Sequence, residues 1–151
     1  MRLAQTDDLP MLLDLMADFY VESGYALDRA HAEEAFSALL ADPRLGRVWL
    51  IQQGSDVVGH VVVTFVFAME YGGVTAVVDD FYVRPASRGA GLGTSALAEV
   101  RRVCAELGMR AMRVEVGGDN AVAQSVYRRV GFDAVDHLLM TLPLADPTHE
   151  A

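Results

Sequence analysis

The sequence of 151 residues has a single cysteine, Cys104. One cysteine excludes an internal disulfide and suits a reducing cytoplasm. No CxxC pair or His–Cys cluster of zinc spacing occurs, so we expect no metal. The longest apolar-rich stretch, residues 57–69, contains Gly59, His60 and Thr64 and is too short to cross a bilayer. The N-terminus lacks a basic region followed by an apolar run, and we expect a cytoplasmic protein without a secretory signal or a membrane partner.

Positive charge is also scarce. Lys and Arg total 12 against 21 Asp and Glu, which gives a formal net charge of −9. This charge disfavours a nucleic-acid partner, because phosphate binding requires a basic surface. It suits a cationic substrate, since a negative cleft concentrates amines, although acidity also keeps a protein soluble. The length and the 52% apolar content predict one compact domain over residues 1–145 and a short tail at 146–151.

Hydrophobic periodicity and turn signals predict an α/β (α+β) domain with a mixed sheet flanked by helices. Two helices follow a short first strand, the first capped by Asp7 or Asp8 and the second opened by Asp28. Later helices run to Gly108 and over 121–130. The predicted element order is β-α-α-β-β-β-α-β-α-β. The first strand ends at Leu3 and Ala4, and the later strands cover residues 47–52, 57–67, 74–84, 112–116 and 138–142.

A glycine-rich loop, Arg88-Gly89-Ala90-Gly91-Leu92-Gly93, lies between a predicted strand and a predicted helix. At a helix N-terminus, unpaired backbone amides and the helix dipole attract an anion. Glycines allow that backbone to approach phosphate oxygens, and Arg88 can add a charge-assisted contact. The alternative is a flexible turn that happens to be rich in glycine.

Several phosphate ligands are compatible with such a loop. The P-loop lysine is missing, which disfavours a nucleoside triphosphate. Residues 91–96 fit the dinucleotide pattern GxGxxA, with Glu115 at the spacing of a ribose-binding carboxylate. The pattern comes after half of the chain, however, and too little sequence follows to build a doubly wound nucleotide-binding sheet.

Three segments in the correct order resemble the GCN5-related N-acetyltransferase (GNAT) superfamily. The loop fits the form Gln/Arg-x-x-Gly-x-Gly/Ala of that family. The preceding Val78-Asp79-Asp80-Phe81-Tyr82-Val83-Arg84-Pro85 resembles the strand before its phosphate loop, and residues 120–132 resemble its later helix. The resemblance covers about residues 74–132. It implies a GNAT-like, mostly antiparallel central sheet.

The resemblance implies that acetyl-coenzyme A is the cosubstrate. Its pyrophosphate would bind the backbone amides of Arg88, Gly89, Ala90, Gly91, Leu92, Gly93 and Thr94. The strand segment of Phe81, Tyr82 and Val83 would pair with the pantetheine arm as an added strand does, and a splay between this strand and residues 112–116 would admit the arm. Asn120 resembles a polar contact to the arm, and it can equally cap a helix.

The resemblance also suggests catalytic residues. Tyr127 lies where the family has a tyrosine that protonates the leaving thiolate, and a phenol can donate while remaining neutral. Its alternative role is packing. An amine nucleophile must lose a proton, which a carboxylate can accept directly or through water. In relatives with an acidic pair here, the first member lies nearest the amine, which makes Asp79 the expected base; Asp80 would orient substrate or stabilise a loop.

The implied function is therefore an acetyl-coenzyme A-dependent N-acetyltransferase. It would acetylate a primary amine of a cationic small molecule, or of a peptide, by direct attack in a ternary complex. The alternative is a non-catalytic acyl-coenzyme A-binding regulatory module on the same fold. Homodimers are common in the family, but no segment of the sequence alone establishes one here.

Overall fold

Five strands form one sheet in the order in which they occur in the sequence. The computed structural model describes residues 1–145. Neighbouring strands are antiparallel from β1 to β4, whereas β4 and β5 are parallel. This is the mixed, mostly antiparallel α+β fold that the sequence predicted. The strands are β1 (Arg2–Leu3), β2 (Gly46–Gln53), β3 (Asp56–Ala68), β4 (Gly73–Val83) and β5 (Met112–Val114).

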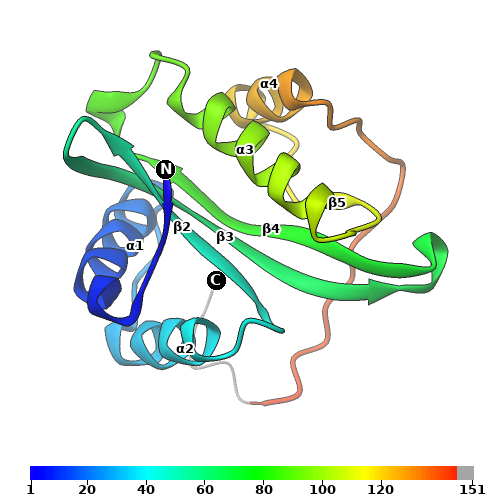
Figure 1. The fold of residues 1–151 in the computed structure, drawn as a ribbon, viewed down its shortest axis with the longest axis horizontal. Coiled ribbons are helices and arrows are strands. Elements are labelled where there is room, and N and C mark those ends of the chain that lie inside the picture. Colours follow the sequence, from blue (N-terminus) through cyan, green and yellow to red (C-terminus); the bar gives the residue numbers. More distant parts are fainter. Residues whose placement is uncertain (146–151) are drawn as a thin grey trace.

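Two helices cover each face of the sheet. Figure 1 shows α1 (Leu9–Ser23) and α2 (Arg29–Ala41) on one side, and α3 (Leu92–Glu106) and α4 (Ala121–Val130) on the other. The predicted cap of α2 is confirmed, because the Asp28 carboxylate accepts a hydrogen bond from the His31 amide at 3.1 Å. Short 3₁₀ turns lie at Thr6–Asp8, Met69–Tyr71 and Pro85–Ser87.

Both faces of the central strands are buried, so their side chains divide between two hydrophobic clusters. Successive strand residues point to opposite faces. Trp49 and Val61 therefore pack with α3 and α4, while Leu50 and Val62 pack with α1 and α2. A strand that is covered on both sides reads as a nearly continuous apolar run. This explains why β2 and β3 show little polar alternation in the sequence.

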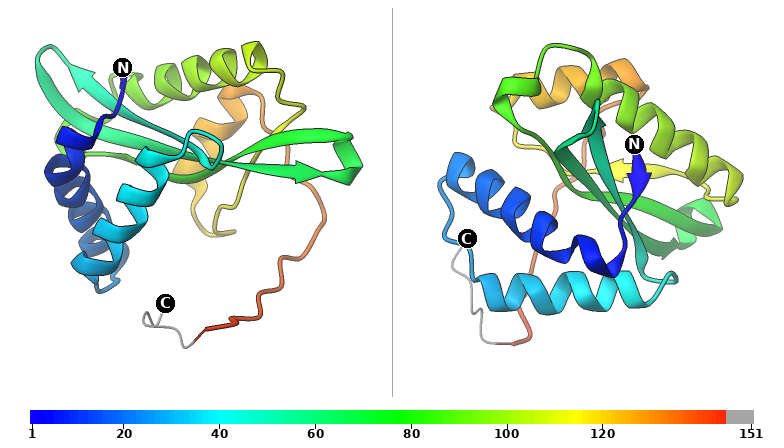
Figure 2. Two further views of the ribbon diagram at one scale, coloured as in Figure 1. Left: turned by 60° about the horizontal axis from the view of Figure 1, so that its bottom comes forward. Right: turned by 60° about the vertical axis from the view of Figure 1, so that its left-hand side comes forward.

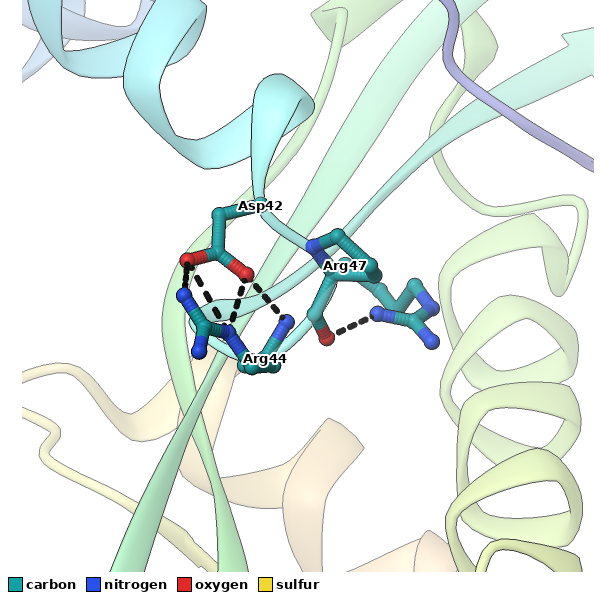
Figure 3. Close-up of polar contacts among 4 residues, drawn as sticks. Asp42, Arg44 and Arg47 are labelled. Carbon is teal, nitrogen blue, oxygen red and sulfur yellow. Dashed lines mark hydrogen bonds and ion pairs between the residues drawn. The ribbon is translucent and has the colours of Figure 1, made fainter.

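The connection from α2 to β2 is held by the polar contacts drawn in Figure 3. The Asp42 carboxylate accepts hydrogen bonds from the backbone amide of Arg44 at 3.0 Å and from its guanidinium at 2.8 Å. These bonds lower the pKa of Asp42 to about 2. Arg47 donates to the Pro43 carbonyl, and its guanidinium lies 5.5 Å from the centre of the Phe65 ring. The contacts fix the direction in which the chain enters β2.

The strand predicted over residues 138–142 is wrong. This segment has no regular secondary structure, and its large side chains are exposed. A strand requires a hydrogen-bonding neighbour, and within the described residues the segment does not pair with the sheet. The strand predicted over 112–116 ends at Val114, where its pairing with β4 ends.

His60 is a fully buried histidine in the middle of β3. Its ring centre lies 6.4 Å from that of Phe36 and 6.3 Å from that of Tyr82. Neither ring nitrogen has a hydrogen-bond partner. Burial lowers the pKa of His60 to about 4, because the apolar surroundings disfavour the imidazolium. His60 is therefore a neutral core residue at physiological pH.

We expect His60→Leu to remove a pH dependence of stability. The unfolded side chain binds its proton near pH 6.5 and the folded one only near pH 4, so its contribution to stability is lost as pH falls between these values. The loss amounts to about 3 kcal/mol of unfolding free energy. The Asp80 carboxyl, with a raised pKa of about 6, acts in the opposite direction over much of this range.

The difference between wild type and His60→Leu therefore isolates the histidine. Urea unfolding of both proteins at pH 7, 5.5 and 4 measures it. The variant should gain about 3 kcal/mol relative to wild type on going from pH 7 to pH 4. Parallel stability curves would show that His60 accepts a proton in the folded state as readily as in the unfolded chain.

Candidate functional site

β4 contains a β-bulge at the acidic pair of Asp79 and Asp80. Against β3, Val62 pairs with Asp80 but Val63 pairs with Val78, so Asp79 is the extra residue of a β-bulge. A bulge bends its strand and increases the local twist. The registered pairs between β4 and β5 end at Val78 and Val114. Beyond them, the backbone of residues 79–83 has no strand partner on the β5 side in the described sheet. The pairing therefore ends within the region in which the resemblance implies a splay.

The glycines of the loop after β4 have two different structural reasons. Gly89 and Gly91 have φ angles of +81° and +77°, in the left-handed region that only glycine adopts without cost. Gly93 instead provides space, because a Cβ atom there would lie 2.9 Å from Cζ of Phe81. The loop can therefore turn sharply while α3 begins in contact with the ring of Phe81.

The N-terminus of α3 presents free backbone donors. Its first intrahelical hydrogen bond runs from the Ser95 amide to the Gly91 carbonyl at 3.0 Å. The amides of Leu92, Gly93 and Thr94 precede that bond and have no acceptor within the helix. Together with the positive end of the helix dipole, they form an arrangement that can hold an anion.

The side chain of Arg88 is engaged elsewhere. Its Nε donates to the Val83 carbonyl at 2.8 Å, and its Nη2 donates to Glu22 at the same distance. The guanidinium also lies 5.6 Å from the centre of the Tyr82 ring. The backbone amide of Arg88 donates to the Pro85 carbonyl at 3.2 Å. A contact from Arg88 to a phosphate, as expected from the sequence, would require breaking these bonds; as it stands, Arg88 ties the loop to α1.

Tyr127 projects from α4 into the core and is 8% exposed. Its ring centre lies 6.1 Å from that of Phe81 and 5.6 Å from that of Phe132. Burial, with a smaller effect of the negative charge of Asp80, raises the pKa of Tyr127 to about 12. The residue is thus both a packed aromatic ring and a phenol that stays protonated at neutral pH.

The two members of the acidic pair lie in different environments. Asp79, the bulged residue, is exposed, whereas Asp80 is half-buried. Burial, and secondarily the charge of Asp79, raises the pKa of Asp80 to about 6. The charge of Asp80 in turn raises the pKa values of Tyr127 and of Tyr20 in α1, where burial is the larger cause. The charge of Asp80 thus acts on one tyrosine of α1 and on one of α4.

The last turns of α1 are fastened to β4 and the loop by two ion pairs. Asp18 binds Nε of Arg84 at 2.9 Å, and Glu22 binds Arg88 at 2.8 Å. Each pair joins residues 66 positions apart in the sequence. Because all four side chains are partly exposed, each pair contributes little to stability. Their effect is to hold α1 against the chain that follows β4.

Asn120 caps α4, which is one of the two roles that the sequence left open for this residue. Its Oδ1 atom accepts a hydrogen bond from the Ala123 amide at 3.1 Å. Gln124, which sequence reasoning did not single out, donates its side-chain amide to the carbonyls of Gly117 and Gly118 at 2.9 and 3.1 Å. These bonds hold the loop between β5 and α4. The position of Gln124, seven residues after Gly117 and six after Gly118, carries no recognisable signal in the sequence.

Other sequence features prove to be structural. Cys104 is 1% exposed within the core formed by α3. Trp49 belongs to the same hydrophobic cluster. Over residues 1–145, no helix has the length and apolar character needed to cross a membrane.

Comparisons with known proteins agree with this architecture. The model of the acetyltransferase (GNAT) family matches residues 9–132. An integron cassette protein from the mobile metagenome of Cole Harbour Salt Marsh has 47% sequence identity and a TM-score of 0.89, over 99% of this chain and 93% of its own. A search of curated protein sequences found no significant match.

Two more distant structures share the fold. A predicted acetyltransferase from Clostridium acetobutylicum, crystallised with acetyl-CoA, has 18% identity and a TM-score of 0.79, over 93% of this chain and 94% of its own. The aminoglycoside 6′-N-acetyltransferase of Acinetobacter haemolyticus has 17% identity and a TM-score of 0.76, over 96% of this chain and 98% of its own.

Proposed function

Because the chain belongs to the acetyltransferase (GNAT) family, we propose that it transfers the acetyl group of acetyl-coenzyme A to a primary amine. The acceptor is a cationic small molecule or peptide. The observation that carries the proposal is the opening between β4 and β5, which begins at Asp79 and Asp80 and beside which Tyr127 packs on Phe81 of the same strand. Asp80 is a carboxyl group with a pKa of about 6, and Tyr127 is a phenol that remains neutral.

The residues present fit the cosubstrate. The amides of Leu92, Gly93 and Thr94 would hold its pyrophosphate, and the left-handed Gly89 and Gly91 keep side chains away from them. The edge of β4 over residues 79–83, which has no strand partner on the β5 side, would bind the pantetheine arm through its backbone. The distant relative from Clostridium acetobutylicum that was crystallised with acetyl-CoA supports this assignment by its fold.

Acetyl transfer forms a bond between the amine nitrogen and the acetyl carbon and breaks the bond between that carbon and sulfur. The Asp80 carboxylate accepts the proton of the amine, directly or through a water molecule. Its pKa of about 6 leaves it mostly ionised at pH 7 and still basic enough for this task. Tyr127 donates its phenolic proton to the departing thiolate. The sequence predicted Asp79 as the base. Here its charge adds to the effect of burial in raising the pKa of Asp80.

The acceptor class follows from charge. The net charge of −9 and the carboxylates of Asp79 and Asp80 favour a cationic amine. Burial, and secondarily the charges of Asp80 and Asp79, raises the pKa of Tyr20 in α1. An aminoglycoside acetyltransferase shares the fold, which makes polyamines and aminoglycosides suitable members of a first screening panel.

The direct test is turnover of acetyl-coenzyme A with a panel of amines, followed by the release of free thiol. Calorimetry with coenzyme A measures binding separately. Thiol release that depends on one class of amine would support the proposal. Binding without turnover on a broad panel would instead support the non-catalytic module, and absence of binding would refute both.

We expect Asp80→Asn to abolish the acid limb of the pH–rate profile. In the wild-type enzyme kcat/KM should fall as pH drops through about 6, because the base becomes protonated. The variant should be slower by about 10²-fold or more at pH 7. In Asp79→Asn the neighbouring charge is gone, so the limb should move to lower pH with activity retained. The opposite pattern, with Asp79→Asn inactive, would make Asp79 the base.

Tyr127→Phe removes one hydroxyl and keeps the ring between Phe81 and Phe132. If Tyr127 protonates the thiolate, kcat should fall roughly 10²-fold, while KM for acetyl-coenzyme A changes little. Steady-state kinetics together with a thermal melt make this measurement. Full activity with every acceptor would remove the hydroxyl from the mechanism, and a parallel change in kcat and KM would assign it to positioning.

Gly91→Glu should weaken coenzyme A binding by at least tenfold, because the new carboxylate repels the pyrophosphate. Gly108→Glu is the matched control. Gly108 has a φ angle of +78°, close to the +77° of Gly91, and an added Cβ meets no atom within 4 Å at either site. Both variants therefore carry a similar backbone cost of about 1–2 kcal/mol. Calorimetry should show weaker binding only for Gly91→Glu; equal affinities would place the phosphates elsewhere.

A further inference from the structure

The side chain of Arg88 connects the glycine-rich loop (residues 88–93) to two other elements. Its guanidinium donates to the carbonyl of Val83, the last residue of β4, and to the carboxylate of Glu22 in the last turn of α1. Both distances are 2.8 Å. In the right view of Figure 2 the end of α1 lies toward this loop. One side chain therefore holds the beginning of the loop against both the sheet and α1.

The guanidinium of Arg88 also rests on a buried ring. Its centre lies 5.6 Å from the centre of the Tyr82 ring, and Tyr82 is 5% exposed. The Tyr82 ring packs in turn with Phe19 of α1, at 5.4 Å between ring centres. A planar guanidinium can stack on an aromatic ring while its N–H groups bind acceptors. Within residues 1–145, Glu22 is the one acidic partner of Arg88, so this carboxylate balances its charge.

The glycine-rich loop needs such support. At its start the Arg88 amide donates to the Pro85 carbonyl at 3.2 Å. At its end the Ser95 amide donates to the Gly91 carbonyl at 3.0 Å. Gly89 and Gly91 have left-handed φ angles, and an added Cβ would meet no described atom within 4 Å at either residue. Because glycine loses more conformational freedom on ordering than other residues, a fixed Arg88 limits the shapes that this loop can take.

A second ion pair of the same helix does not reach the loop. Asp18, one helical turn before Glu22 in α1, binds Nε of Arg84 at 2.9 Å. Arg84 precedes Pro85, and its backbone amide donates to the Val58 carbonyl of β3 at 2.8 Å. The Asp18 pair thus fastens α1 to the end of β4, whereas the Glu22 pair fastens α1 to the loop.

We propose that Glu22 is a positioning residue for the cosubstrate. Glu22 holds Arg88, and through Arg88 it keeps the loop in the shape that binds the pyrophosphate before coenzyme A arrives. Preordering a binding loop raises affinity, because less conformational entropy is lost on binding. The inference rests on the proposed function, which assigns the pyrophosphate to the amides of Leu92, Gly93 and Thr94. In this role the Arg88 side chain remains on Glu22 when coenzyme A is bound.

Calorimetry with coenzyme A tests the proposal. Glu22→Ala should weaken binding by about fivefold, the upper end of the effect expected for one exposed charge pair. Glu22→Gln keeps an acceptor oxygen for Arg88 and should remain closer to the wild type. Asp18→Ala is the matched control, because it removes the neighbouring ion pair of the same helix and should leave the affinity unchanged. Alanine favours helices, so neither change to alanine disturbs α1.

A double-mutant cycle shows whether Glu22 acts through Arg88. Arg88→Gln should weaken coenzyme A binding by a similar factor, and Glu22→Ala should have no further effect in that background. Tighter binding by Glu22→Ala alone would mean that a released Arg88 contacts the phosphates, which would overturn the proposal. An equal loss on adding Glu22→Ala to the wild type and to Arg88→Gln would also overturn it, since Glu22 would then act independently of Arg88.

Limited proteolysis reports on the loop in the absence of coenzyme A. Trypsin must take the arginine side chain into its own pocket, so the bond after Arg88 is cut only when Arg88 leaves its partners. Glu22→Ala should speed this cut by about fivefold, in proportion to the released population, and Asp18→Ala should not. Mass spectrometry of the fragment that ends at Arg88 makes the measurement. Equal rates in the wild type and Glu22→Ala would show that Glu22 does not hold Arg88.

Steady-state kinetics separate positioning from chemistry. In Glu22→Ala the KM for acetyl-coenzyme A should rise about fivefold with kcat unchanged. A fall in kcat at unchanged KM would place Glu22 in the acetyl transfer and contradict its positioning role. Wild-type protein that binds no coenzyme A would refute the proposed function and this inference with it. Wild-type binding that Glu22→Ala retains in full would refute this inference alone.

Discussion

The candidate site depends on the point at which β4 and β5 stop pairing. Their registered pairs end at Val78 and Val114, directly before the bulge at Asp79. If the ladder continued, the amides and carbonyls of the following residues would be used by the sheet, and the acidic pair would lie on an ordinary strand. The interruption instead leaves an open backbone edge. Two residues after the bulge, the Phe81 ring lies against Gly93 of α3 and packs with Tyr127 of α4.

Electrostatics in the opening are set mainly by burial and only secondarily by charge. Burial is the larger cause of the raised pKa of both Asp80 and Tyr127. The consequences of burial differ, because the ordinary pKa of an aspartate lies far below neutral pH and that of a phenol lies far above it. The pKa of the carboxyl comes close to neutral pH, so the group can exchange a proton there. The phenol, in contrast, holds its proton more firmly. Burial thus favours a base at Asp80 and an acid at Tyr127.

The two ends of the chain are stabilised very differently. The first helix is tied to β4 and to the loop by contacts that cross most of the sequence, through Asp18 and Glu22. Among the described residues, the segment after α4 has no such ion pair, although residues 131–145 contain four leucines, as many as α1. Apolar surface lowers the free energy only when another surface covers it, so composition does not guarantee a place in the fold.

Local chemistry in the sequence determined most of the elements and the position of the glycine loop. Asp28 as a cap, the hairpin between β2 and β3, and the boundaries of α4 follow from interactions between residues close in the chain. The relative roles of Asp79 and Asp80 required the tertiary structure. A bulge breaks the alternation from which a strand's buried face is inferred, and it arises from pairing with β3. Elements distant in sequence likewise decided which partners Arg88 has and that residues 138–142 form no strand. Ion pairs and strand ladders need a neighbour that local sequence does not specify.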